Sequence, residues 1–151
     1  MAVIQFSFPL KPCSVNKWKI PKSMGGGRVS MCLSKEYRHF QNDLDIYFNI
    51  PKNADLLKGF CGVVKENDRL YLEIVVYGPD FYTKKGKISK TGGDSSNFIK
   101  AIEDGLFNAL KCYSNLNDAQ CFTSIGRKEN ADEWRIEINL GLEDCAKPDT
   151  L

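Results

Sequence analysis

The segment from Ser95 to about Lys111 is the most sharply patterned part of the chain, and it limits the fold more than any other feature. Apolar side chains recur there every three or four residues, which places them on one side of an α-helix. Asp94 stands where an N-cap residue would be. A helix with one apolar side must cover another element, so we expect it to lie on a sheet or a second helix. The apolar positions are Phe98, Ile99, Ile102, Leu106, Ala109 and Leu110.

Strands are predicted both before and after this helix in the sequence. Leu70 to Tyr77 is rich in β-branched and aromatic residues and is closed by Gly78-Pro79, which is typical of a buried strand. The turn at 128–131 predicts that the last two strands form a hairpin. The other strands are expected at 3–10, 120–126 and 133–142.

The N-terminal half predicts a second helix and two irregular stretches. Ser34 is suited to cap a helix that Pro51 ends, and the connector from there to Asp68 has room for one short helical turn. Proline and Gly25-Gly26-Gly27 predict a loop before a short strand that begins at Arg28. We therefore expect an α+β fold in the order β-α-β-α-β-β, with a mixed sheet packed against helices over residues 1–142 and a tail at 143–151. The apolar positions of this second helix are Tyr37, Phe40, Leu44, Tyr47 and Phe48.

Composition excludes several classes of protein. With 151 residues, of which 42% are hydrophobic and 26% charged, the chain matches one ordinary globular domain, and no segment has the apolar length of a membrane span. The N-terminus lacks the basic start and apolar stretch of a secretory signal, so we expect a cytoplasmic protein. The six cysteines form no C-x-x-C pair and His39 is the only histidine, which excludes a structural zinc site and favours free thiols.

Lysines are concentrated in the expected loop at 80–93. The formal net charge of +2 decides little by itself, but four lysines close together can meet a phosphate backbone. The alternative is a flexible loop whose lysines are merely solvated. These residues are Lys84, Lys85, Lys87 and Lys90.

Polar residues share one face of the 95–111 helix. Asp94, Asn97, Lys100 and Asp104 fall within an arc of about 120°, beside the apolar stripe. The ordinary explanation is a solvated face on which Lys100 and Asp104 form an i,i+4 ion pair. Periodicity alone therefore does not establish a site.

A further acid, Asp118, comes just before the strand at 120–126. If that strand pairs beside Leu70–Tyr77, Asp118 points back toward the start of the helix and closes a cluster of carboxylates. Hard cations such as Mg²⁺ prefer oxygen ligands and assist phosphodiester hydrolysis. The alternative is an Asx-type turn residue with no chemical role.

These residues, taken in order, resemble the signature of RusA-type Holliday junction resolvases. That signature reads D-x-D-N-x-x-K-x-x-x-D-x-L and is followed after a short gap by D-D-x-x. It is matched here from Asp94 to Leu106 and from Asn117 to Gln120. The resemblance covers roughly residues 3 to 142, because the N-terminal part fits as well. Its matching pieces there are Ser14-Val15-Asn16-Lys17-Trp18, the glycine-rich turn, Arg28-Val29-Ser30 and Tyr37-Arg38.

The resemblance implies a homodimer whose two active sites cut opposed strands of a four-way DNA junction with Mg²⁺ or Mn²⁺, in a bacterial cell or encoded by a phage. Asp94 and Asp118 match the family's metal-binding aspartates, and Lys100 matches its essential lysine. Asn97 and Asp104 also match family positions, as a supporting residue and a further catalytic contributor. The expected DNA contacts are Asn16, Arg28, Lys84, Lys85, Lys87 and Lys90.

One position departs from the signature, because Ser96 replaces the second aspartate of D-x-D. Either Ser96 holds a metal-bound water, or Asp104 or Glu103 supplies the missing charge, or activity has been lost. The alternatives to a junction resolvase are therefore a non-catalytic protein that binds branched DNA, and a nuclease of the same chemistry that acts on flaps or forks.

Overall fold

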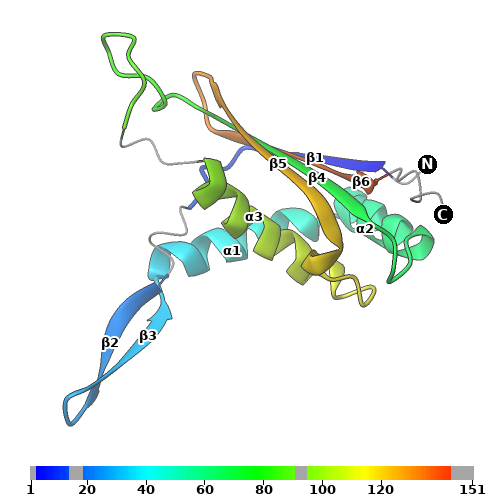
Figure 1. Cartoon of the computed structure of the whole chain (residues 1–151), viewed down its shortest axis with the longest axis horizontal. Coiled ribbons are helices and arrows are strands. Elements are labelled where there is room, and N and C mark those ends of the chain that lie inside the picture. The colour runs from blue at the N-terminus through cyan, green and yellow to red at the C-terminus, as the bar shows by residue number, and fades with distance from the viewer. Residues whose placement is uncertain (1–2, 14–18, 91–94, 144–151) are drawn as a thin grey trace, which may run out of the picture.

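The computed structural model describes residues 3–13, 19–90 and 95–143, without the side chains of 19–24, 28–33 and 95–97. It is an α+β fold with a four-stranded mixed sheet and three α-helices, which confirms the predicted class (Figure 1). The order of the elements is β-β-β-α-α-β-α-β-β and not the predicted β-α-β-α-β-β. No helix in these ranges is long and apolar enough to cross a membrane. The elements are β1 (Val3–Phe8), β2 (Lys19–Gly25), β3 (Arg28–Leu33), α1 (Lys35–Phe48), α2 (Pro51–Val63), β4 (Leu70–Gly78), α3 (Ser95–Leu110), the 3₁₀ turn η2 (Asp118–Gln120), β5 (Cys121–Asn130) and β6 (Arg135–Leu142).

The main sheet has the strand order β1-β6-β4-β5. β4 pairs in parallel with β5 and antiparallel with β6, and β6 pairs antiparallel with β1. Alternate side chains of β4 point to opposite faces, and Leu72 and Ile74 are fully buried on the face that the helices cover. On the other face Tyr71 and Glu73 are only half-buried, although Val75 is buried, and the described helices all lie on the first face.

The predicted hairpin between the last two strands is wrong. β5 and β6 lie on opposite sides of β4 and do not pair with each other. Helix α3 crosses the sheet between β4 and β5, which makes β5 parallel to β4. The chain then passes the end of β4, where Ala131 N–H donates to Gly78 O at 2.9 Å, and returns as β6. The turn residues correctly indicated that the chain reverses direction between β5 and β6, but they did not indicate that β4 lies between these two strands.

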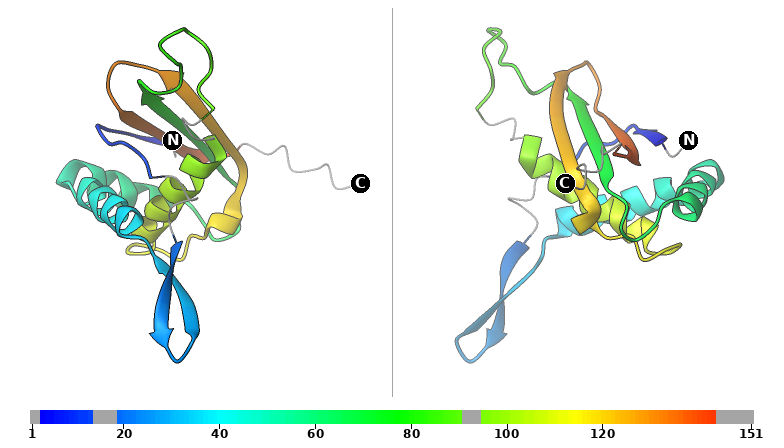
Figure 2. Two further views of the ribbon diagram at one scale, coloured as in Figure 1. Left: turned by 90° about the vertical axis from the view of Figure 1, so that its left-hand side faces the viewer. Right: turned by 45° about the vertical axis from the view of Figure 1, so that its right-hand side comes forward.

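Helix α3 packs against β4 and β5, and α1 packs in turn against α3 (Figure 2). The Ser34 hydroxyl accepts a hydrogen bond from Tyr37 N–H at 3.1 Å, which confirms the predicted cap of α1. Gly105 permits the close approach of the two helices, because a Cβ atom there would lie 2.6 Å from Leu44 Cδ1. The predicted apolar stripe of α3 is confirmed, and Ala101 and Phe107 are buried as well.

Two predictions for the N-terminal half are wrong. Residues 51–63 form helix α2 rather than a connector with one short turn, and Pro51 begins this helix after α1 has ended at Phe48. A proline fits the first turn of a helix because no intrahelical bond is needed from its nitrogen. Residues 19–25 form strand β2 rather than a loop, and pair with β3 in a ribbon that projects from the body (Figures 1 and 2). Pro21 is tolerated because a two-stranded ribbon has open edges.

The predicted flexible loop at 80–93 contains a hydrogen-bonded hairpin. Tyr82 and Ile88 form an antiparallel bridge, and Thr83 N–H donates to Lys87 O at 2.7 Å. The prediction of free thiols is confirmed for Cys61, Cys112 and Cys121.

Candidate active site

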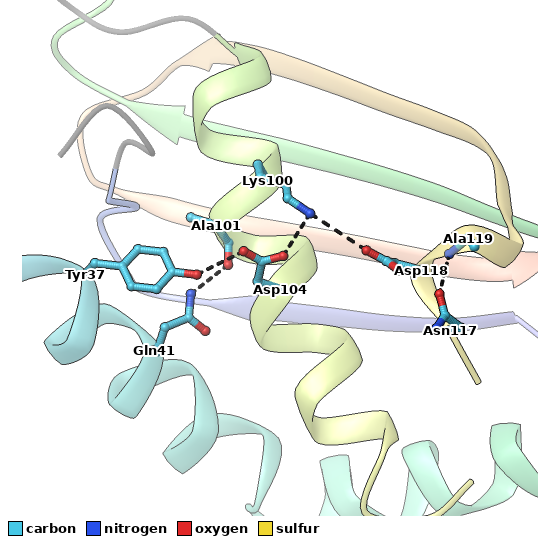
Figure 3. A network of polar contacts seen from close by, with 8 residues as sticks. All are labelled: Tyr37, Gln41, Lys100, Ala101, Asp104, Asn117, Asp118 and Ala119. Atoms are coloured by element: carbon cyan, nitrogen blue, oxygen red, sulfur yellow. Dashed lines mark hydrogen bonds and ion pairs between the residues drawn. The ribbon is translucent and has the colours of Figure 1, made fainter. Parts of the chain in front are cut away.

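Lys100 is the centre of the candidate site (Figure 3). Its Nζ lies 3.0 Å from Asp104 Oδ1 and 3.7 Å from Asp118 Oδ2. The contact with Asp104 is the i,i+4 pair expected from the sequence, whereas the contact with Asp118 joins two separate segments. The side chains of Lys100 and Asp118 are each 47% exposed, so solvent and a ligand can reach both.

The 3₁₀ turn η2 holds Asp118 in place. The Asn117 side chain accepts a hydrogen bond from Ala119 N–H at 2.8 Å, and Gln120 Oε1 accepts one from Asn117 N–H at 3.1 Å. Asn117 is thus the capping residue, and the Asp118 carboxylate is left to face Lys100. The predicted pairing of this strand beside β4 is confirmed, and it brings the turn before β5 to α3, where Asp118 meets Lys100.

Helix α1 supplies two side chains that the sequence analysis missed. The Tyr37 hydroxyl donates a hydrogen bond to Asp104 Oδ2 at 2.9 Å, and Gln41 Nε2 donates to Ala101 O at 2.8 Å. Burial, with the hydrogen bond to Asp104, raises the pKa of Tyr37 far above its ordinary value, so the hydroxyl keeps its proton. In the sequence, Tyr37 stands out as part of the matched piece Tyr37-Arg38, and Gln41 lies four residues further along the same helical face.

A cleft of about 350 Å³ opens beside these residues. The Tyr37–Asp104 pair and Asp118 line this cleft, which has room for a small ligand or a phosphate group. Gln41 Oε1 is buried without a hydrogen-bond partner at its edge. The lining residues are Tyr37, Gln41, Asp104, Phe107, Asn108, Lys111 and Asp118.

Negative charge accumulates around the Lys100 ammonium. Burial raises the pKa of the Glu103 carboxyl; Lys100 opposes this shift, whereas Asp118 and Asp104 add to it. The hydrogen bond with Asp104 raises the pKa of Lys100, which therefore stays charged. Burial, with Glu103 and Asp118 nearby, raises the pKa of the Cys121 thiol to about 12. Asp104, Glu103 and Asp118 thus all act electrostatically on the one ammonium of Lys100.

The donor chemistry fits a hard divalent cation, because carboxylate oxygens are the ligands that Mg²⁺ and Mn²⁺ prefer. Among residues 3–13, 19–90 and 95–143, however, no group of three or more His, Cys, Asp or Glu side chains is placed to hold one ion. The resolvase resemblance assigns the second metal-binding aspartate to Asp94, which lies outside the described residues.

The other predicted site residues are only partly described. Asp94 and Asn16 lie outside the described residues, as do the side chains of Ser96 and Asn97 in the first turn of α3 and that of Arg28 at the start of β3. The lysines predicted to bind DNA are all exposed: Lys84, Lys85, Lys87 and Lys90.

Comparison with known proteins adds no assignment to this geometry. A scan of protein-family models and a search of curated proteins find no match to the chain.

Proposed function

We propose that the protein is a divalent-metal-dependent endonuclease of the RusA type, which hydrolyses phosphodiester bonds in branched DNA such as four-way junctions and acts as a homodimer. The observation that carries the proposal is the contact of Lys100 with both Asp104 and Asp118. These are residues at which the sequence resembles the resolvase signature, and Asp118 reaches Lys100 from a segment beyond the end of α3.

The proposed chemistry divides between the metal and the chain. Asp94 and Asp118, with Ser96, would hold the metal, which supplies a Lewis acid and lowers the pKa of a bound water. The Lys100 ammonium lies beside Asp118 and is exposed, so it can stabilise the negative charge that develops on the phosphate. Asp104 and the Tyr37 hydroxyl hold this ammonium in position.

The test is incubation with a labelled mobile four-way junction, with and without Mg²⁺, beside a linear duplex of equal length. We expect cleavage of the junction only, and only with the metal. Asp94→Asn and Asp118→Asn should each remove cleavage and preserve junction binding, because each deletes ligand charge with little change in volume. Asp55→Asn, an exposed acid on α2, is the matched control and should cleave normally. Near-normal cleavage by both site variants would contradict the proposal.

Lys100→Ala tests the role of the ammonium separately. Its side chain is half-exposed and lies off the apolar stripe, so folding should be preserved while the cleavage rate falls. Thermal denaturation is the control for folding. A large loss of thermal stability with little loss of rate would restore the structural explanation, in which Lys100 only pairs charges on a helix face.

A second candidate function is the binding of branched DNA without cleavage. Two observations favour it: Ser96 stands where the signature has an acid, and Lys100 already pairs with both Asp104 and Asp118. The same assay separates the candidates, because a binding protein would hold the junction with or without Mg²⁺ and leave it intact. Cleavage of flaps or forks in preference to the four-way junction would keep the chemistry and change the substrate.

A further inference from the structure

The hairpin formed by residues 81–89, called here the basic hairpin, stands out beyond the end of the sheet (Figures 1 and 2). Thr83 N–H donates to Lys87 O at 2.7 Å and Ser89 N–H to Phe81 O at 3.0 Å, on either side of the bridge between Tyr82 and Ile88. Gly86 closes the turn with φ of +77°, a conformation that favours glycine. The hairpin is thus a defined element.

The root of the basic hairpin is anchored in the core, between the end of the sheet and the first turn of α3. Phe81 is only 4% exposed and packs edge-on against Trp134, with ring centroids 5.6 Å apart. Trp134 lies directly over Gly78, where a Cβ atom would clash with its ring. The Phe81 ring also lies 6.3 Å from that of Phe98, two residues before Lys100 on α3. The root of the hairpin is therefore packed against the first turn of the helix that carries Lys100.

The projecting part exposes two large apolar side chains, since Tyr82 is 51% exposed and Ile88 is 74% exposed. Residues that face each other across an antiparallel bridge point to the same side, so these two form one small surface. The ring of Tyr82 is thus presented to solvent with an aliphatic neighbour beside it. Nothing in the packing of the sheet requires an aromatic residue there.

Positive charge surrounds this surface. Residues 81–90 contain four lysines and no acid. An exposed ring among ammonium groups matches single-stranded nucleic acid, because a base stacks on the ring while the adjacent phosphates meet the charges. In a duplex the faces of the bases are covered by stacking, so the ring finds a partner only where nucleotides are unpaired. The four lysines, all exposed, are Lys84, Lys85, Lys87 and Lys90.

We infer that the basic hairpin binds unpaired nucleotides, with Tyr82 stacking on a base, Ile88 supporting the ring, and the lysines meeting the flanking phosphates. The hairpin root contacts α3, the helix of Lys100, so the bound nucleotides are expected near the cleaved bond. This placement rests on the proposed function. The binding itself does not depend on cleavage.

The test is fluorescence anisotropy, in EDTA, with a labelled oligothymidylate and a blunt duplex of equal length. Tyr82→Ala should weaken binding of the oligothymidylate by about five-fold or more, as loss of one stacked base does, and should leave duplex binding within about two-fold. The salt dependence of oligothymidylate binding should be the same for Tyr82→Ala as for the wild type, since no phosphate contact is lost. Tyr82→Phe should bind like the wild type, and Tyr82→Leu, which keeps apolar bulk without a ring, should bind like Tyr82→Ala.

Other results would overturn the inference. Wild-type affinity of Tyr82→Ala for the oligothymidylate, an equal loss for both DNAs, or no binding of the oligothymidylate by the wild type would each show that Tyr82 does not stack on an unpaired base. The junction assay with Mg²⁺ is read separately. If oligothymidylate binding does not depend on Tyr82 but the junction is cleaved normally, only the hairpin's role is rejected. If binding depends on Tyr82 but no junction is cleaved, only the nuclease function is rejected.

Discussion

Lys100 shows how one side chain can have both a local and a tertiary role. Its pair with Asp104 would form on an isolated helix, where such pairs are worth only about 0.3–0.5 kcal/mol. Its contact with Asp118 and the hydrogen bond from Tyr37 to Asp104 exist only in the folded chain. The tertiary contacts therefore distinguish this cluster from an ordinary solvated helix face.

Tyr37→Phe tests whether the hydroxyl positions Asp104 and, through it, Lys100. Loss of the 2.9 Å hydrogen bond should lower the free energy of unfolding by about 0.5–1.5 kcal/mol and should reduce the rate of junction cleavage. Tyr71→Phe is the control, because it removes a tyrosine–carboxylate hydrogen bond, to Glu73, on the open face of the sheet. Equal cleavage by both variants would show that Tyr37 is purely structural. The measurements are denaturant titration and single-turnover kinetics.

Ser96→Asp tests the departure from the resolvase signature. If two aspartates alone hold the metal, an added anionic oxygen should lower the Mg²⁺ concentration needed for half-maximal cleavage. Asp104→Asn should then matter little for metal dependence, since the two positions differ by eight residues, on the order of 12 Å along the helix axis.

If Asp104 instead supplies the missing charge, Asp104→Asn should abolish cleavage and Ser96→Asp should partly rescue it. The contact of Asp104 with Lys100 and Tyr37 favours the first outcome, because that carboxylate is already occupied. Full activity of Asp104→Asn, with no effect of Ser96→Asp on metal dependence, would defeat both explanations.

At the scale of elements, the approach of α1 to α3 builds one wall of the candidate site. The two helices come close at Gly105, which faces Leu44 and Gln41. Strand β5 and helix α3 approach similarly at Gly126, where a Cβ atom would clash with Ile99. Small residues at these two contacts allow α3 to lie between α1 and the sheet, with Lys100 at its polar edge.

Gly105→Ala should therefore destabilise the fold by up to about 2 kcal/mol, because crowding of Leu44 and Gln41 costs about 1–3 kcal/mol and helix propensity returns about 1 kcal/mol. Gly59→Ala is the matched control, since this glycine of α2 has no atom within 4 Å of the Cβ position. It should stabilise the protein by up to about 1 kcal/mol through helix propensity. Thermal or denaturant unfolding measures both changes, and equal stabilisation by the two variants would contradict the predicted packing.

At the scale of the whole molecule, two features project from the body, the β2–β3 ribbon and the basic hairpin (Figure 2). The hairpin carries a local excess of positive charge although the net charge of the chain is only +2. Distribution rather than net charge thus determines where a phosphate backbone can bind.

Replacing Lys84, Lys85 and Lys87 together by glutamine should weaken junction binding and flatten its dependence on salt. Each lost phosphate contact reduces the slope of log K against log salt by about 0.9. A variant with Lys35, Lys52 and Lys58 replaced by glutamine undergoes the same change in net charge on exposed helix surface and is the control. If both variants lose the same affinity and slope, the effect is one of net charge and the hairpin makes no special contact.

The sequence by itself determined the elements whose signal is local. The strand at 70–78, the cap of α1 at Ser34, the stripe of α3 and the Lys100–Asp104 pair all follow from spacing within a few residues. Helix α2 was missed because its apolar residues, chiefly Leu57 and Phe60, form a weak stripe.

Tertiary structure decided what depends on residues far apart in the chain. The crossover through α3 placed β5 and β6 on opposite sides of β4, although the turn between them reads as a hairpin. The same crossover brought Asp118 to Lys100, and the packing of α1 brought Tyr37 to Asp104 across 67 positions. Neighbouring residues cannot specify such contacts, because the pairing of strands and the packing of helices depend on which buried surfaces fit together in the whole fold.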